Sequence, residues 1–274
     1  MSAKRPVMWR GTVFHVFVLV VLAAYLFPFY WMVLSSLKTQ VQNVAFPPLF
    51  IFAPTLENYR SVFVNNPFFL YLWNSLVIGF GSTLLGLLLG LPAAYGIARY
   101  RRQKVALAFL IARIAPGISY LVPWFIVFSK FDLVGSYTAL ILSHLTVGLP
   151  LIVWIMIGFF EDVPSEMEDA AHIDGASQFD IFLKVALPMV MPGVLTAAIL
   201  SFIQSWNTFM YSVVLANADT RTLPVAVFGF MSYGGFDWGS ITAAATVITL
   251  PVMVLTLFIQ RHIVGGLSMG SVKG

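Results

Sequence analysis

The chain has 274 residues, of which 59% are hydrophobic and only 9% carry a charged side chain. A soluble domain of this length cannot bury so much apolar surface, so the composition excludes an ordinary globular protein and predicts an integral membrane protein. Cysteine is absent, which excludes disulfides and thiol chemistry, and the net charge of +4 is carried mostly at the ends of apolar runs, which does not suggest nucleic-acid binding.

Six apolar segments are long enough to cross a membrane. They cover residues 14–34, 73–98, 105–129, 137–160, a run that begins near residue 192, and 240–260. The first is too long for a signal peptide and no cleavage site follows it, so we interpret it as a retained helix. Residues 35–71 contain four prolines and predict an ordered loop with short helices. The predicted fold is all-α, a polytopic membrane protein with six transmembrane helices.

Several small or polar residues lie inside these spans and predict how the helices pack or what they face. Gly86 and Gly90 stand in G-x-x-x-G spacing in the second span, which predicts close helix packing. Arg113 lies inside the third span, and two interpretations stay open for it. It either faces protein or water, or extends from a helix end to the membrane interface. His144 in the fourth span is interpreted as a packed core residue.

The fifth span carries a polar and aromatic cluster formed by Gln204, Trp206, Asn207, Thr208 and Tyr211. Arg113, Gln204, Trp206, Asn207 and Tyr211 could line a translocation path for a hydroxylated solute, because aromatic faces stack on sugar rings and amides bond hydroxyls. The alternative is a helix end in the aromatic belt with bonds between helices. The residues slightly favour the second interpretation.

A charged segment, residues 161–192, interrupts the apolar runs and must be exposed at a membrane surface. It holds seven of the eleven acidic residues: Glu161, Asp162, Glu166, Glu168, Asp169, Asp174 and Asp180.

Local signals in this segment predict a helix, a turn and a second helix. Ser165 and Glu168 have the spacing of a capping box, and Gly175 is placed to end the first helix. Ser177 then begins a second helix, on which Asp180 and Lys184 form an i, i+4 pair. Pro188 and Pro192 are predicted to bend the chain as it re-enters the bilayer.

The segment resembles the EAA loop of ABC importer permeases, in which the pattern reads E-A-A-x3-G-x9-I-x-L-P. Here Asp169, Ala170 and Ala171 are followed by Gly175, Val185, Leu187 and Pro188, so Asp replaces Glu and Val replaces Ile. The residues alone leave an amphipathic interfacial helix as an equal alternative, and the long spaced motif favours the permease loop. The resemblance implies that residues 161–188 form a coupling helix that docks on an ATPase subunit through Glu168 to Ala171, Gly175, Leu187 and Pro188.

Other short segments resemble the carbohydrate-uptake, maltose-type branch of the same family. They include Ser205-Trp206-Asn207 and the ending Gly266-Leu267-Ser268-Met269-Gly270-Ser271-Val272-Lys273-Gly274, with Ser268 where the branch has Thr. The resemblance implies that Val272, Lys273 and Gly274 of the tail, residues 261–274, contact the ATPase. It also implies one transmembrane domain over residues 1–274, with a core at 73–264. The glycines of the tail predict that it forms no stable helix by itself.

The resemblance implies an importer subunit that is not itself an enzyme. No P-loop motif occurs in the sequence, so ATP and Mg²⁺ are expected on a partner. The expected partners are a second permease, an ATPase dimer, an extracytoplasmic solute-binding protein, the lipid bilayer, and a sugar or polyol. An ABC permease for glycerol phosphate or an amino acid is the alternative. A secondary transporter is disfavoured because no predicted span contains Asp or Glu.

The distribution of basic residues predicts the orientation. With six spans, ten Lys and Arg residues share the side of both termini: Lys4, Arg5, Arg10, Arg99, Arg101, Arg102, Lys104, Lys184, Arg261 and Lys273. Four stand on the other side: Lys38, Arg60, Lys130 and Arg221. The positive-inside rule then predicts cytoplasmic termini and a cytoplasmic charged loop, in a multi-pass protein of the bacterial inner membrane.

Overall fold

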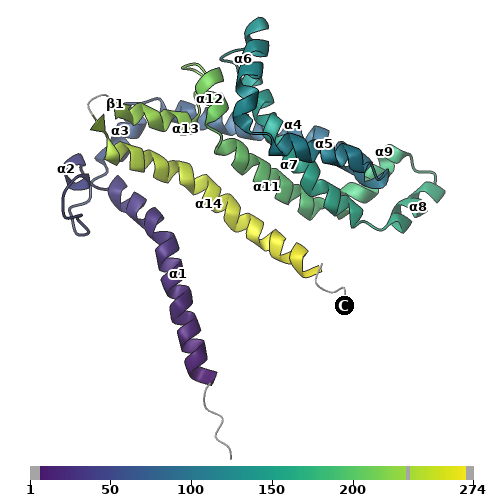
Figure 1. Cartoon of the computed structure of the whole chain (residues 1–274), viewed down its shortest axis with the longest axis horizontal. Helices are drawn as coiled ribbons and strands as arrows, with labels where there is room; N and C mark the ends of the chain where they lie inside the picture. The colour runs from purple at the N-terminus through teal and green to yellow at the C-terminus, as the bar shows by residue number, and fades with distance from the viewer. Residues whose placement is uncertain (1–6, 233–234, 270–274) are drawn as a thin grey trace, which may run out of the picture. The chain divides into compact units, whose positions relative to one another are not determined.

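The computed structural model describes the backbone of residues 7–232 and 235–269, and side chains over a slightly shorter range (Figure 1). The chain divides into two compact units. The first combines Met1–Asn66 with Val227–Thr249, and the second combines Pro67–Ala226 with Leu250–Gly274. Almost all regular structure is helical, and the strands that are described form one short antiparallel ribbon.

The first unit begins with a long apolar helix and continues through short elements. Its elements are α1 (Val7–Ser36), α2 (Gln40–Asn43), α3 (Glu57–Val64), η3 (Phe228–Phe230), the ribbon of β1 (Met231–Ser232) and β2 (Gly235–Phe236), and the beginning of α14 (Trp238–Met269). α2 starts with the capping box that the sequence of Thr39 and Gln42 supplies. The Gln40 amide then donates to the carbonyl of Phe236 at 2.7 Å, which ties α2 to the ribbon.

A buried lysine fixes the corner after α1. Lys38 is 1% exposed, and its ammonium lies 4.1 Å from the centroid of the Trp31 ring and 5.1 Å from that of Phe52. Desolvation by burial lowers the pKa of Lys38, whereas the two ring faces stabilise its charged form. Asn58 donates hydrogen bonds to the carbonyls of Ser36 and Lys38. The prediction of an ordered loop with short helices over residues 35–71 is therefore confirmed.

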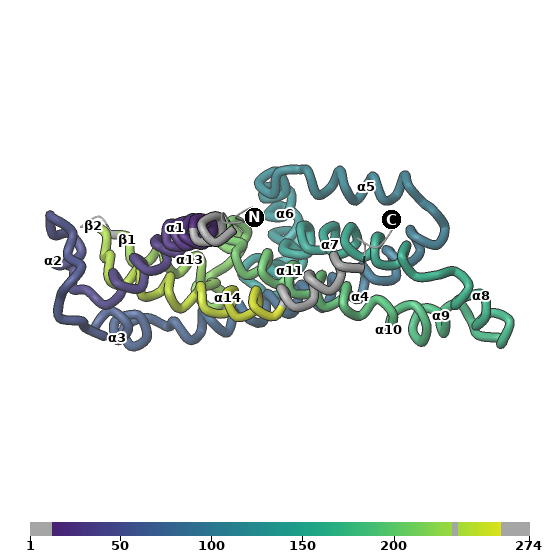
Figure 2. The backbone as a smooth tube through the Cα atoms, turned by 90° about the horizontal axis from the view of Figure 1, so that it is seen from below, coloured from purple at the N-terminus to yellow at the C-terminus, as the bar shows by residue number. Residues whose placement is uncertain are grey.

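The second unit has a core of three packed helices, α4 (Phe68–Arg99), α7 (Tyr137–Glu161) and α11 (Met191–Trp206) (Figure 2). α4 and α7 approach closely where Gly86 and Gly90 face Ile152. A Cβ atom on Gly86 would lie 2.7 Å from a methyl carbon of Ile152, and one on Gly90 would lie 2.9 Å from another. The predicted role of the G-x-x-x-G spacing in helix packing is confirmed.

Shorter elements connect and flank these helices. They are α5 (Gln103–Ile114), η1 (Gly117–Tyr120), α6 (Leu121–Lys130), α8 (Ser165–Ile173), α9 (Gln178–Ile181), the π-helical segment η2 (Phe182–Ala186), α10 (Leu187–Met189), α12 (Met210–Leu215) and α13 (Leu223–Val227). Within the described chain, four helices are long and apolar enough to cross a membrane. The number rises to six if each of two bent helix pairs counts as one span.

The third predicted span, residues 105–129, is not one helix. α5 and the segment that begins at Gly117 meet at an angle of 94°, because Ala115 and Pro116 both adopt extended backbone angles. Proline lacks the N–H that would continue the ladder, and it disfavours the helical region for the residue before it. The predicted span therefore consists of two helices, and Arg113 lies in the last turn of the first.

The fifth span begins at Met191, as predicted, but it ends earlier than expected. α11 stops at Trp206, and Tyr211 lies on the separate helix α12. The Thr208 hydroxyl donates to the carbonyl of Gln204 at 2.8 Å, which satisfies one free acceptor at the end of α11. The prediction that one helix carries all five cluster residues is corrected.

The sixth helix is longer than predicted. α14 continues to Met269 rather than ending near residue 260, so the expectation that the glycine-rich tail is not helical is wrong for residues 261–269. Glycine lowers helix propensity by about 1 kcal/mol per residue without forbidding the conformation. The proposed ATPase contacts Val272, Lys273 and Gly274 lie outside the described residues.

Candidate functional site

The charged segment forms the helix, turn and second helix that its sequence predicts. α8 ends with a Schellman motif, in which the N–H of Gly175 bonds to the carbonyl of His172 and that of Ala176 bonds to the carbonyl of Ala171. Gly175 has a φ of +84°, which only glycine adopts at no steric cost. Ser177 then caps α9 by accepting from the N–H of Asp180 at 3.2 Å.

Glu168 anchors α8 to the end of α4 and does not cap its own helix. α8 begins after Pro164 without a side-chain cap, so the predicted capping box is absent. Glu168 is only 7% exposed, and its Oε1 lies 2.6 Å from Nη2 of Arg99. Tyr95 donates its hydroxyl to Oε2 at 3.0 Å. The same Arg99 donates to the carbonyl of Val163 at 3.0 Å, so one buried network fixes the start of the loop.

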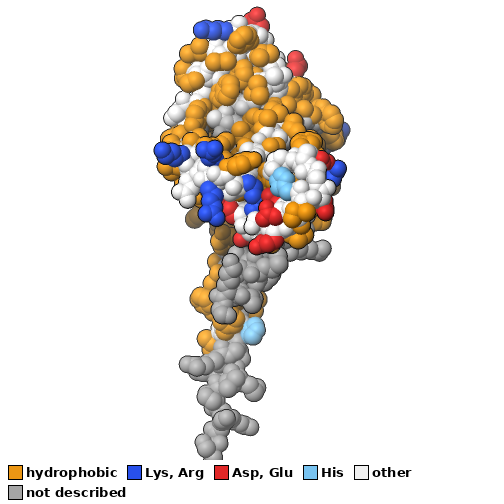
Figure 3. Space-filling view, turned by 90° about the vertical axis from the view of Figure 1, so that its right-hand side faces the viewer, with side chains coloured by type: hydrophobic (Ala, Val, Ile, Leu, Met, Phe, Trp, Pro, Cys, Tyr) orange, Lys and Arg blue, Asp and Glu red, His pale blue; other side chains and the backbone are white. Residues whose placement is uncertain are grey.

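The opposite face of the loop is exposed. Asp169 and Ala170 are exposed and Ala171 is half-buried. Ile173 is 87% exposed and Phe179 is 69% exposed, although both side chains are apolar. Figure 3 shows charged side chains of both signs gathered on this end of the molecule, with hydrophobic side chains around them. An apolar and acidic surface of this kind fits a docking site for another protein.

The chain returns to α11 through an irregular helix. η2 is π-helical and the bend between Gln178–Met189 and Met191–Trp206 is 79°. Proline at residue 188 removes one backbone donor at this point, which fits the local change of hydrogen-bond pattern. Leu187 is half-buried and Pro188 is exposed, and the predicted pair of Lys184 and Asp180 is present at 2.6 Å.

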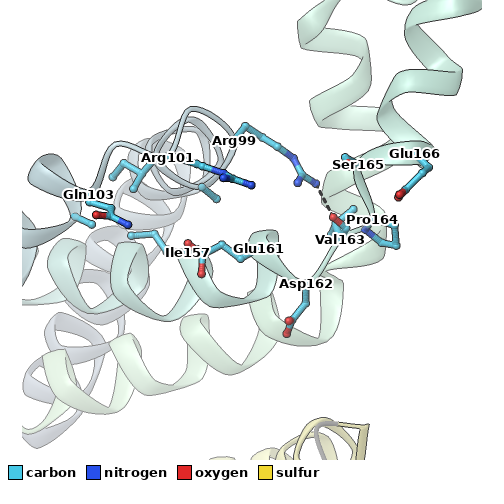
Figure 4. Close-up of a pocket in the computed structure, with 13 residues that line it drawn as sticks. Arg99, Arg101, Gln103, Ile157, Glu161, Asp162, Val163, Pro164, Ser165 and Glu166 are labelled. Carbon is cyan, nitrogen blue, oxygen red and sulfur yellow. Dashed lines mark hydrogen bonds between the residues drawn. The ribbon is translucent and has the colours of Figure 1, made fainter. Parts of the chain in front are cut away.

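A cavity of about 650 Å³ adjoins the anchored side of α8. Figure 4 shows Arg99 and Arg101 entering from the end of α4 and the turn after it, with Glu161, Asp162 and Glu166 on the side of α7 and α8. The dashed bond in that view is the one from Arg99 to the carbonyl of Val163. Basic residues at the end of α4 and in the turn after it therefore lie beside the acidic segment, and Arg99 contacts it directly.

A second cavity of about 570 Å³ opens where two helices are broken. One break follows α5 and the other follows α11. Four of the five predicted path residues line this cavity: Arg113, Gln204, Asn207 and Tyr211. Tyr120 and Thr146 also line it and were not predicted from the sequence. They come from two other segments, and no local spacing could have revealed them.

The fifth predicted path residue, Trp206, does not line the cavity. Its side chain is 1% exposed and stacks on Phe202 with ring centroids 5.6 Å apart. This geometry fits the helix-packing alternative for Trp206. The prediction that it belongs to the path is not supported by this geometry.

His144 is buried in the helix core, as predicted. Its Nδ1 lies 2.7 Å from Oγ of Ser205, which also accepts a hydrogen bond from Ser82 at 3.1 Å. These three residues join α7, α11 and α4, so they form a polar bridge within the three-helix core.

Comparison with known proteins agrees with this arrangement. Residues 1–268 match the family described as binding-protein-dependent transport system inner membrane component. The chain belongs to this family. It is therefore a permease subunit of ABC transporters, a multi-pass membrane protein in a family whose ATPase is a separate subunit.

Two curated relatives extend over nearly the whole permease. The trehalose transport system permease protein SugB of Mycobacterium tuberculosis is 37% identical, and the alignment covers 100% of both chains. The sulfoquinovosyl glycerol transport system permease protein SmoH of Agrobacterium fabrum is 36% identical, over 91% of this chain and 89% of the relative.

A solved structure supports the fold of the permease. It is that of a bacterial ABC transporter involved in the import of the acidic polysaccharide alginate, and the matched chain has a TM-score of 0.78. The match covers 95% of this chain and 99% of that chain at 17% sequence identity. The predicted all-α transmembrane permease fold is therefore confirmed.

Proposed function

We propose that this permease pairs with a second permease to form the path of a sugar or polyol, which an extracytoplasmic binding protein delivers. ATP and Mg²⁺ would bind to a dimer of separate ATPase subunits. The family description and the sugar-related names of both relatives support this proposal. The matched spaced motif, from Asp169 to Pro188, supports the coupling role.

The observation that carries the coupling role is the division of α8 into two faces. Glu168 is held by Arg99 and Tyr95, whereas Asp169 and Ile173 are exposed on the same short helix. A helix that is fixed to the membrane core on one side can transmit a displacement applied to its other side. We assign Glu168 to anchoring, and Asp169, Ala170 and Ala171 to contact with the ATPase.

The coupling role also requires a particular orientation of the permease in the membrane. The excess of basic residues stands on the side of the α8 loop, so this side is proposed to be cytoplasmic, with both termini. The host membrane would be a bacterial inner membrane, in which residues 1–274 act as one transmembrane domain. The tail residues Val272, Lys273 and Gly274 remain proposed ATPase contacts.

The cavity at the two helix breaks is proposed as this subunit's part of the path. Arg113, Gln204, Asn207 and Tyr211 line it, and irregular backbone at membrane depth is tolerated where it lines a cavity. Its volume of about 570 Å³ lies within the usual range for small-molecule sites.

Ala171→Trp tests the coupling role in a reconstituted complex of both permeases, the ATPase and the binding protein. The bulky ring should prevent close approach of the ATPase, so ATP-dependent uptake should be abolished while the permease still inserts. Ala24→Trp, on the exposed surface of α1, is the matched control and should retain uptake. Normal uptake by Ala171→Trp would reject the assignment of this loop.

A further inference from the structure

Arg113 brings a positive charge to the cavity between the broken helices. It stands in the last turn of α5, and no carboxylate lies within 4.0 Å of it among the residues that the structure describes. The described residues that line the cavity include no Asp or Glu. An arginine within a membrane span is costly, at roughly 2.5–3.5 kcal/mol on insertion scales, unless it faces water, protein or a ligand.

Two amides line the same cavity as this arginine. Gln204 and Asn207 are three residues apart at the end of α11, and both side chains are exposed. Neither amide group makes a hydrogen bond within the described part of the chain. Each offers a donor and an acceptor, which is the combination that hydroxyl groups require.

Other polar groups of the cavity are already bonded. Tyr211 donates to the carbonyl of Gly117 at 3.2 Å, and Tyr120 donates to that of Ala112 at 3.3 Å. Thr208 donates to the carbonyl of Gln204. These bonds hold the two helix breaks in shape, so one guanidinium and two amides remain available for a ligand.

We propose that the substrate is an anionic sugar or polyol, whose carboxylate, sulfonate or phosphate group binds Arg113. Its hydroxyl groups bind Gln204 and Asn207. Arginine presents a planar fork of donors that matches such oxyanions, and a charge-assisted pair is stronger inside a cavity than in water. This inference rests on the proposed function, because it assumes that the cavity belongs to the path.

The test is ATP-dependent uptake by phosphatidylcholine proteoliposomes that contain the complete complex with its binding protein. The vesicles are offered an equimolar mixture of neutral and anionic sugars. The neutral members are glucose and its methyl glycoside. The anionic members are glucuronate and its methyl glycoside, glucose 6-phosphate and 6-deoxy-6-sulfoglucose. Mass spectrometry measures what accumulates. We expect an anionic member to accumulate in preference to its neutral counterpart.

Variants at Arg113 then test whether this residue causes the preference for anionic sugars. Arg113→Gln should lower uptake of the anionic sugar by about tenfold or more, and Arg113→Lys should retain part of it. Arg102→Gln, at the other end of α5 and outside the cavity, removes the same charge and should change uptake less than twofold. Equal loss in both variants, or unchanged uptake in Arg113→Gln, would overturn the proposal.

Three further outcomes separate failure of this inference from failure of the proposed function. Accumulation of neutral sugars alone overturns the anionic substrate and leaves the proposed importer standing. No ATP-dependent accumulation of any sugar contradicts the proposed function, and the inference fails with it. If the effect of Arg113→Gln appears only after phosphatidylglycerol is added to the vesicles, the anion is a lipid headgroup and the proposal of an anionic substrate is overturned.

Discussion

Two arginines of the second unit have opposite surroundings. Arg99 ends α4, bonds to Glu168 and to the carbonyl of Val163, and is largely buried. Arg113 lies in the last turn of α5, is exposed to a cavity, and has no acidic partner within the described chain. The first therefore fixes the loop to the helix core, whereas the second is available to bind something that the chain does not supply. The same side chain has a structural role in one place and a proposed binding role in the other.

The largest expected effect separates packing from binding within the cavity region. Trp206→Ala should destabilise the complex by about 3–5 kcal/mol, because it empties a buried site next to Phe202. Asn207→Ala should leave the thermal unfolding midpoint unchanged and lower the rate of uptake. Thermal unfolding and uptake of both variants check this. A large fall in the unfolding midpoint of Asn207→Ala would place that residue in the packing as well.

Removal of Glu168 should weaken the attachment of α8 to the end of α4. Glu168→Ala leaves the Arg99 guanidinium without its carboxylate, and a buried pair broken in this way costs about 3 kcal/mol. We expect loss of uptake and a lower unfolding midpoint, with Glu168→Gln intermediate because it keeps an acceptor for Tyr95.

Glu166→Ala is the matched control, since Glu166 is an exposed acid in the first turn of the same helix. It should behave like the unmodified permease in both assays. Equal behaviour of Glu166→Ala and Glu168→Ala would remove the basis for an anchoring role.

The turn after α8 depends on backbone conformation alone. A Cβ atom at Gly175 would meet no atom within 4 Å, so a substitution there acts only through the φ of +84°. Gly175→Val should cost about 1–2 kcal/mol and impair uptake, whereas Gly175→Asn should be milder because asparagine tolerates this conformation. The relative uptake rates of the two variants measure the difference, and equal rates would show that the turn can adopt another geometry.

The smallest effect is expected at the exposed pair of Asp180 and Lys184. Both side chains are in contact with solvent, at 38% and 74% exposed, and such pairs contribute little to stability. Asp180→Ala should leave uptake and the unfolding midpoint unchanged. A clear fall in the midpoint would mean that charge on the exposed side of the loop also anchors it.

The sequence predicted those features of the site that depend on neighbours along the chain. Gly175, the cap at Ser177 and the pair of Asp180 and Lys184 are all local signals, and each is confirmed. The G-x-x-x-G packing of α4 could be predicted too, because helical spacing puts both glycines on one face.

The role of Glu168 could not be predicted in this way. Its partners Arg99 and Tyr95 are 69 and 73 residues distant in the sequence. The local spacing of Ser165 and Glu168 predicted a capping box instead, and this assignment is wrong. Spacing along the chain carries no information about a distant arginine. The break at Pro116 could not be predicted either, since hydropathy indicates a membrane span but not whether its helix is continuous. The cavity exists only because this break and the end of α11 meet in space.

The most direct test of the coupling role is a photo-crosslink from the exposed face of α8. A photoreactive phenylalanine analogue at Ile173, which is 87% exposed, is irradiated in membranes that contain the assembled transporter. Leu84, an exposed apolar residue of α4, provides the control position. We expect a covalent adduct between position 173 and the ATPase subunit, identified by mass spectrometry, and none from position 84. Adducts of position 173 with lipid or the binding protein, and none with the ATPase, would contradict the coupling role.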